Sequence, residues 1–154
     1  PGHPSELNSI RGGGGSLSAE LDGLVVEEVC GIADGERRTI LFVEDHEVMR
    51  AIVSDYLEHS VLGGCVSLIA AETLTRARQL MKEKNGRVDC VLLDLCLPDA
   101  TMDDHIECLR NEWSGISVVV LSAVDNWDFV NQLRLCGIRG FISKKMTMDY
   151  NGHG

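Results

Sequence analysis

Short apolar runs alternate with amphipathic segments along most of the chain, and the two patterns have different periods. The apolar runs are typical of buried strands and occupy residues 40–43, 65–70, 89–95, 116–122 and 140–143. Between them, apolar residues recur every three or four positions, which predicts helices that end near 59 and span about 72–84, 104–113 and 126–136. Five buried strands separated by amphipathic helices predict an α/β fold, a doubly wound parallel sheet covered on both faces.

The apolar positions of each helix also predict which side chains face the sheet. They are Met49, Ile52, Val53, Tyr56 and Leu57 in the first helix, Leu74, Ala77, Leu80 and Met81 in the second, Ile106, Leu109 and Trp113 in the third, and Phe129, Val130 and Leu133 in the fourth. Because each set recurs at helical spacing, we expect one buried stripe on each helix.

The segment before the first strand has a different composition. Residues 1–16 are rich in Gly, Ser and Pro and predict a flexible leader. Residues 17–36 predict an amphipathic helix, with apolar residues at helical spacing from Leu17 to Val29, followed by a linker. We therefore divide the chain into a leader, this N-terminal helix with its linker, a main domain over 37–146 and a short tail over 147–154.

Composition narrows the function classes. The net charge is −10 and the basic residues are scattered, so we expect no direct nucleic-acid binding by this chain. The six cysteines form no C-x-x-C pair, which favours reduced thiols. No apolar run approaches the roughly 18 residues that span a bilayer, and no signal peptide is evident. The sequence thus predicts a cytoplasmic protein without a membrane segment.

Polar residues with complementary chemistry follow the predicted strands. Glu44 and Asp45 follow the first strand, Asp94 ends the third, Ser122 ends the fourth and Lys144 follows the fifth. In an open parallel sheet, ligands bind outside the carboxyl ends of the strands, so these residues are predicted to converge. Clustered carboxylates repel one another unless a cation compensates, and Mg²⁺ with its oxygen ligands is the natural partner. The set suits phosphoryl transfer to a carboxylate.

Each of these residues alone has an ordinary structural explanation. An acid after a strand often begins a helix, where negative charge is favoured. A lone serine usually bonds to nearby backbone, and a lone lysine is usually solvated. The functional interpretation rests on finding all five at the correct strand ends.

The segments that carry these residues resemble the signatures of bacterial two-component response-regulator receiver domains. They read ILFVEDHEVMR, VLLDLCLP, VVVLSA and GFISK, in the family's order and at similar spacing, and the resemblance covers roughly residues 38–146. It implies a flavodoxin-like sheet of order 2-1-3-4-5. It also implies a phosphorylation-dependent signalling switch rather than an enzyme, with a histidine kinase or phosphotransfer protein as partner.

The resemblance further implies a role for each residue of the site. Asp94 accepts the phosphoryl group; Asp45 binds Mg²⁺ directly with help from Glu44, and Asp94 and the backbone carbonyl of Cys96 complete the protein ligands.

Three further residues belong to the switch that the family implies. Lys144 pairs with the phosphate, Ser122 turns toward it on activation, and Phe141 is the aromatic side chain whose rotamer reports the switch.

The sequence departs from the family in two places. The loop after the third strand reads LPDATMDDH and lacks the usual glycines, which puts its shape in doubt. Only KMTMDYNGHG follows Lys144, so the fifth helix of the family is either missing or replaced by the amphipathic helix near 17–30. That helix could pack on its own domain or be exchanged in a homodimer.

Two other functions stay open at this point. A phosphoaspartate-forming hydrolase needs a second acid two residues after its nucleophile, and Cys96 occupies that position. A pseudo-receiver binds partners without phosphorylation, and the altered loop keeps this alternative. A nucleotide-binding domain is set aside because neither G-x-G-x-x-G nor a P-loop is present.

Overall fold

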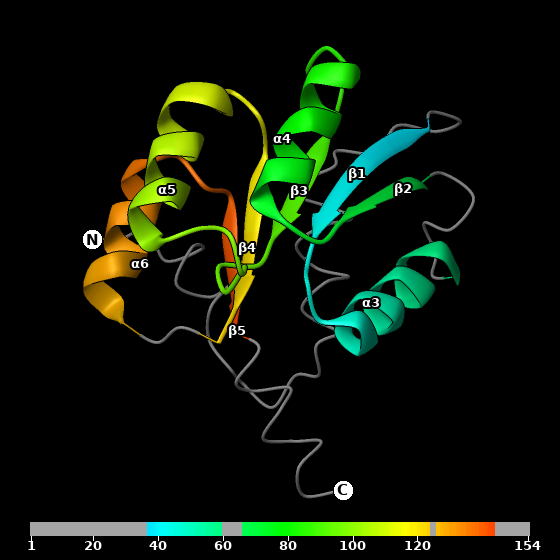
Figure 1. Ribbon diagram of the computed structural model, residues 1–154, viewed down its shortest axis with the longest axis horizontal. Coiled ribbons are helices and arrows are strands. Elements are labelled where there is room, and N and C mark those ends of the chain that lie inside the picture. Colours follow the sequence, from blue (N-terminus) through cyan, green and yellow to red (C-terminus); the bar gives the residue numbers. More distant parts are fainter. Residues whose placement is uncertain (1–36, 60–65, 124–125, 144–154) are drawn as a thin grey trace, which may run out of the picture.

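The protein forms a five-stranded parallel sheet with helices on both faces (Figure 1). The computed structural model describes residues 37–59, 66–123 and 126–143. The strands are β1 (Arg38–Val43), β2 (Val66–Ala71), β3 (Cys90–Leu93), β4 (Val118–Ser122) and β5 (Gly140–Ser143). Their order in the sheet is β2-β1-β3-β4-β5, and every neighbouring pair is parallel. The predicted fold class and strand order are confirmed.

The helices form one layer on each side of this sheet. They are α3 (Glu47–His59), α4 (Leu74–Glu83), α5 (Met102–Glu107), which continues as the π-helical turn η3 (Cys108–Glu112), and α6 (Trp127–Leu135). Within the described residues, α4, α5 and α6 cover one face of the sheet, and α3 covers the other near β1 and β2 (Figure 1). Every residue of β3 and β4 is buried, as is typical of central strands in a parallel sheet.

The core lies in two clusters, one on each face, and it contains nearly all the predicted inward side chains. The exception is Ile52, which is 53% exposed. Successive helical residues point about 100° apart. Val53 and Leu57 define the buried stripe of α3, so the neighbouring Ile52 lies beside the stripe and faces solvent.

Most predicted boundaries differ from the observed ones by one or two residues, and two of these differences bear on the site. The third strand ends at Leu93 rather than residue 95, although Leu95 is still buried. The helix predicted to begin near Asp104 begins at Met102, because Thr101 and Asp104 form a capping box in which each side chain accepts a backbone N–H of the other residue.

The end of this helix also differs from the periodic pattern. The N–H of Trp113 donates to the carbonyl of Cys108 at 2.9 Å, which closes a π-helical turn instead of an α-helical one. This hydrogen bond spans five residues, one more than in an α-helix. Leu109 and Trp113 are both buried in this arrangement.

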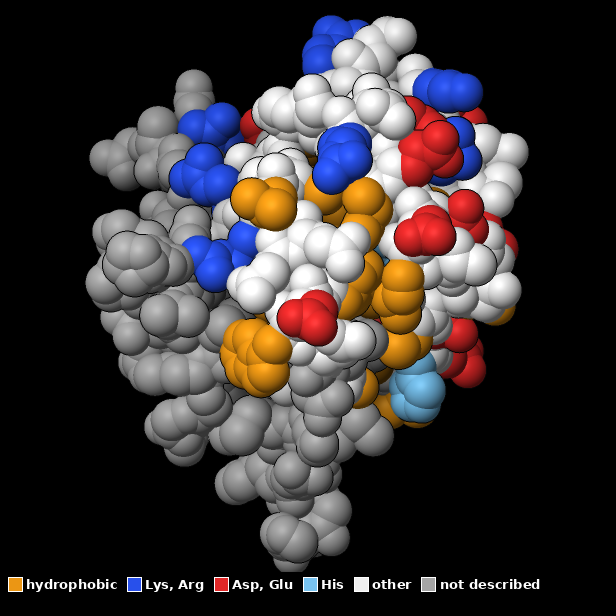
Figure 2. All heavy atoms as spheres, turned by 90° about the vertical axis from the view of Figure 1, so that its left-hand side faces the viewer, with side chains coloured by type: hydrophobic (Ala, Val, Ile, Leu, Met, Phe, Trp, Pro, Cys, Tyr) orange, Lys and Arg blue, Asp and Glu red, His pale blue; other side chains and the backbone are white. Residues whose placement is uncertain are grey.

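Helix α6 presents apolar side chains to solvent opposite its buried stripe. Figure 2 turns the side with α5 and α6 toward the viewer, and hydrophobic side chains lie exposed in its middle. Trp127 and Leu135 of α6 are 59% and 84% exposed, whereas Phe129, Val130 and Leu133 are buried. The predicted inward face of α6 is therefore confirmed.

Several predictions lie outside the described residues. They are the flexible leader, the N-terminal helix and linker, the tail, and the replacement of a fifth helix with the homodimer it suggests. Within the described part of the chain, no helix is long and apolar enough to cross a membrane.

Candidate functional site

Three carboxylates meet at the carboxyl edge of the sheet. Glu44 and Asp45 follow β1, and Asp94 follows β3, the neighbouring strand. The N–H of Asp94 donates to the carbonyl of Val43 at 2.9 Å, which keeps the two strand ends together. One oxygen from each carboxylate lies within 4.8 Å of the others. Glu44 and Asp94 are buried and Asp45 is exposed, so the cluster opens to solvent on one side.

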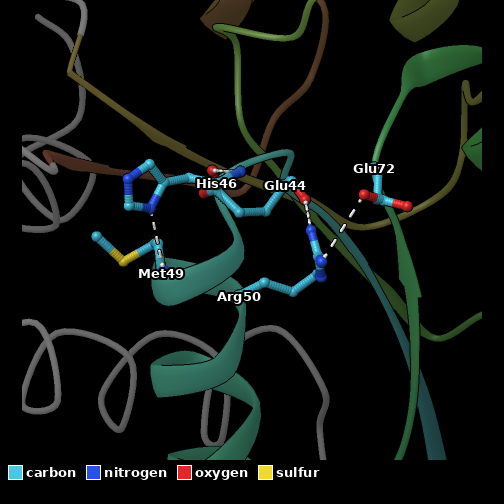
Figure 3. Close-up of polar contacts among 5 residues, drawn as sticks. All are labelled: Glu44, His46, Met49, Arg50 and Glu72. Carbon is cyan, nitrogen blue, oxygen red and sulfur yellow. Dashed lines mark hydrogen bonds and ion pairs between the residues drawn. The ribbon is translucent and has the colours of Figure 1, made fainter.

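The turn that carries Glu44 is held from two sides (Figure 3). The N–H of Glu44 donates to the carbonyl of Ala71 at the end of β2, at 2.9 Å. Arg50 of α3 donates from Nη1 to the Glu44 carbonyl at 2.8 Å, and its Nη2 lies 3.8 Å from the carboxylate of Glu72. The backbone of Glu44 is thus fixed to the end of β2 both directly and through Arg50.

His46 joins the same turn to the start of α3 (Figure 3). Its N–H donates to Oε2 of Glu44 at 3.1 Å, and its Nδ1 accepts the N–H of Met49 at 3.3 Å. The second bond caps the helix in the way that short polar side chains usually do. His46 therefore both orients the Glu44 carboxylate and caps the start of α3.

Cys96, two residues after Asp94, contacts the Asp94 carboxylate through its backbone. The N–H of Cys96 donates to Oδ1 of Asp94 at 3.2 Å. Cys96 is exposed, so its backbone lies at the rim of the carboxylate cluster. The described cysteines, Cys90, Cys96, Cys108 and Cys136, form no disulfide with one another. Burial raises the pKa of the Cys108 thiol to about 12, so this thiol is unreactive.

The remaining predicted site residues lie on β4 and β5 or beyond. Ser122 is fully buried at the end of β4 and lies opposite Ser143 of β5. Phe141 is 5% exposed and packs in the core cluster beneath α4, α5 and α6. Lys144 lies outside the described residues, so its predicted contact with a phosphate stays a prediction.

The loop after β3 is fixed by polar side chains in place of glycines. The Asp99 carboxylate accepts the N–H groups of Leu74 and Thr75 at 2.9 and 2.8 Å, and the Thr75 hydroxyl at 2.7 Å. Desolvation, the largest single influence, raises the pKa of Asp99, but the hydrogen bonds from Thr75 and Leu74 together outweigh it and lower the pKa. A charged Asp99 therefore ties the loop to the start of α4.

The sequence analysis did not identify three residues that support this site: His46, Arg50 and Asp99. A histidine directly before a helix is a weak capping signal, and the T-x-x-D spacing in the loop indicates the capping box that starts α5. The contacts of Arg50 and Asp99 reach across 22 and 25 residues, from Arg50 to Glu72 and from Asp99 to Leu74, and no local pattern predicts them.

The donor set of the cluster suits a hard divalent cation. Three carboxylates so close together carry a negative charge that a cation would neutralise. Carboxylate and carbonyl oxygens are the ligands that Mg²⁺ prefers, and ligands on opposite sides of one Mg²⁺ lie about 4 Å apart. Oxygens within 4.8 Å of one another need only small side-chain rotations to meet that spacing.

Comparisons with known proteins agree with this architecture. A family model described as the response regulator receiver domain matches residues 40–150. The KDP operon transcriptional regulatory protein KdpE of Escherichia coli is 37% identical over 84 residues, which are 54% of this chain and 34% of that protein. A probable transcriptional regulatory protein of Mycobacterium tuberculosis, TcrX, is 32% identical over 93 residues, which are 60% and 37% of the two chains. The chain thus spans about a third of the length of these relatives.

Solved structures show the same fold. The receiver domain of RstA from Klebsiella pneumoniae, in a BeF3-activated form, superimposes with a TM-score of 0.56 at 26% identity and covers 70% of this chain and 86% of that one. A signal receiver domain from Vibrio parahaemolyticus gives a TM-score of 0.61 at 22% identity and covers 76% and 85% of the two chains.

Proposed function

The chain belongs to the response regulator receiver domain family, and from that premise we propose that it is a phosphorylation-dependent signalling switch whose phosphoryl acceptor is Asp94. The observation that carries this proposal is the cluster of Glu44, Asp45 and Asp94 at one edge of the sheet. The cluster combines a buried carboxylate nucleophile with the oxygen ligands of a divalent cation.

Four groups would hold the cation in this proposal. They are the carboxylates of Glu44, Asp45 and Asp94 and the backbone carbonyl of Cys96. Mg²⁺ bound there neutralises charge on the phosphoryl oxygens. His46 and Arg50 keep the Glu44 turn in place, so the ligand set is held in position before the cation binds.

The transfer itself needs one nucleophile. A carboxylate oxygen of Asp94 attacks phosphorus, the bond from phosphorus to the donor breaks, and the donor leaves with the electron pair of that bond. The Ser122 hydroxyl donates to a phosphoryl oxygen, and Lys144 pairs with the phosphoryl charge. The new charge then favours one of two side-chain arrangements of Ser122 and Phe141 over the other, and this change is the switch.

The partner that supplies the phosphoryl group is a histidine kinase or a phosphotransfer protein. We propose that the chain acts in the cytoplasm, where such donors and free thiols occur, and that it is no enzyme beyond its own phosphorylation and dephosphorylation. Since the matched relatives are transcriptional regulators about three times as long as the matched region, we propose that its output is carried by another domain or a partner.

The test is the intact mass of the protein after incubation with acetyl phosphate, with Mg²⁺ or with EDTA. We expect the mass of one phosphoryl group to be added only with Mg²⁺, and the adduct to be lost in hydroxylamine, which cleaves acyl phosphates. Absence of the adduct together with absence of Mg²⁺ binding by titration calorimetry would overturn the proposal in favour of a pseudo-receiver.

Replacing Asp45 by Asn is expected to weaken Mg²⁺ binding at least about tenfold, because a charged ligand is lost. At a Mg²⁺ concentration a hundred times the wild-type Kd, the stabilisation by Mg²⁺ should fall from about 2.7 to about 1.4 kcal/mol or less. The metal-free variant should be more stable than the wild type by about 1 kcal/mol, since repulsion within a solvent-open cluster is relieved. Urea unfolding with and without Mg²⁺ measures both effects.

The matched control is Asp55→Asn, which removes the same charge from an exposed side chain of α3. It should leave the Mg²⁺ increment unchanged. Equal increments for wild type and Asp45→Asn would remove Asp45 from the ligand set.

A further inference from the structure

A histidine lies in the core directly beneath the loop that carries Asp94. His105 of α5 is fully buried, and its Nε2 lies 3.1 Å from the carbonyl oxygen of Leu95. Among the described residues, the other buried polar side chains are Glu44, Asp94 and Ser122, which all belong to the site described above. His105 is thus the one member of that group to which the site has given no part.

The hydrogen bond fixes the chemical form of the ring. A carbonyl oxygen can only accept, so Nε2 carries the hydrogen and donates it to Leu95. Desolvation lowers the pKa of His105, which keeps the ring neutral and leaves Nδ1 as an acceptor. That Nδ1 is buried and has no hydrogen-bond partner among the described residues.

An unpartnered buried acceptor is unfavourable, and an apolar side chain would fill this position without it. Cys108 and Leu109, which follow on the same helix, are apolar core residues. The distinctive contribution of a histidine at this position is therefore its donor, the Nε2–H group that reaches Leu95.

The bond acts on the peptide group between Leu95 and Cys96. Its carbonyl accepts from His105, and its N–H donates to Oδ1 of Asp94 at 3.2 Å. A peptide group is planar and rigid, and no described peptide bond is cis, so its C=O and N–H point in opposite directions. His105 and the Asp94 carboxylate therefore hold the two ends of one rigid unit.

We propose that His105 is a positioning residue for phosphoryl uptake: it fixes the Leu95–Cys96 peptide group so that the Cys96 N–H orients the carboxylate of Asp94. Hydrogen bonds in such a chain polarise and strengthen one another. The bond from His105 to the Leu95 carbonyl therefore also strengthens the bond from the Cys96 N–H to the Asp94 carboxylate. The proposal rests on Asp94 being the phosphoryl acceptor, and it adds a residue from α5 to the machinery.

The variants that test it are His105→Leu, which fills the core without a donor, and His105→Gln, whose amide nitrogen can take the place of Nε2. We expect His105→Leu to remain folded, with some loss of resistance to urea because the Leu95 carbonyl loses its donor. It should take up phosphoryl groups from acetyl phosphate roughly tenfold more slowly than the wild type at saturating Mg²⁺. His105→Gln should recover part of the rate. A wild-type rate in His105→Leu would overturn the proposal, because a purely structural histidine affects stability alone.

A second measurement separates this proposal from the function on which it rests. The amide of Cys96, followed by ¹⁵N NMR without any phosphoryl donor, should exchange with solvent faster in His105→Leu than in the wild type, and His105→Gln should restore its protection. If the wild type forms no adduct but this amide responds, the function fails and the positioning contact stands. If the amide is unchanged in both variants, the positioning contact fails even though the wild type is phosphorylated.

Discussion

The Asp94→Asn variant is expected to take up no phosphoryl group from acetyl phosphate under conditions in which the wild type is modified. Asn keeps the size of Asp and an oxygen that can accept the Cys96 N–H, but its amide is not a nucleophile for phosphorus. The change therefore removes the chemistry and retains the local structure. Intact mass with and without Mg²⁺ gives the result directly.

The variant should remain folded, which makes the loss interpretable. Asp94 is 1% exposed and lies close to two other carboxylates, so removing its charge relieves repulsion in a buried place. We expect its resistance to urea to equal or exceed that of the wild type. Asp103→Asn is the matched control, since Asp103 is an exposed carboxylate at the start of α5 and should not affect the adduct. An adduct that persists in Asp94→Asn would place the acceptor at another residue.

Sequence patterns predicted the sheet and the closeness of its three carboxylates because both depend on local signals. The strands are short apolar runs, and parallel strands bring their carboxyl ends to one edge, so Glu44, Asp45 and Asp94 could be placed together from their positions after strands. The strand order, in contrast, came from the family resemblance, because apolar runs alone do not say which strands are neighbours.

What could not be predicted depends on contacts between distant segments or on helix geometry. Asp99 accepts hydrogen bonds from the start of α4, which lies 25 residues earlier in the chain. An aspartate that follows a proline gives no local signal for so distant a contact. His105 follows two aspartates and carries no apolar signal, yet it lies one helical turn before the buried Leu109 and is itself fully buried.

The Trp113→Ala variant is expected to lose about 3–5 kcal/mol of unfolding free energy, the largest effect on stability that we predict. Trp113 is 2% exposed and is among the largest fully enclosed side chains of the described core. It ends the π-helical turn η3, and its backbone N–H closes that turn, so the backbone around the cavity is fixed and cannot collapse easily. Since small domains are stable by only about 5–15 kcal/mol, the variant should unfold at a clearly lower urea concentration and temperature than the wild type. Urea unfolding followed by circular dichroism measures the change.

The chain contains its own control, because its other tryptophan lies on the surface. Trp127 begins α6 and is 59% exposed, so Trp127→Ala should change the unfolding free energy by no more than about 0.5 kcal/mol. Iodide should quench the fluorescence of Trp127, which remains in Trp113→Ala, far more than that of Trp113, which remains in Trp127→Ala. Equal losses of stability in the two variants would contradict the burial of Trp113 beneath η3. A loss confined to Trp113→Ala would instead show that the side chain directly after the π-helical turn is one of the main side chains of the core.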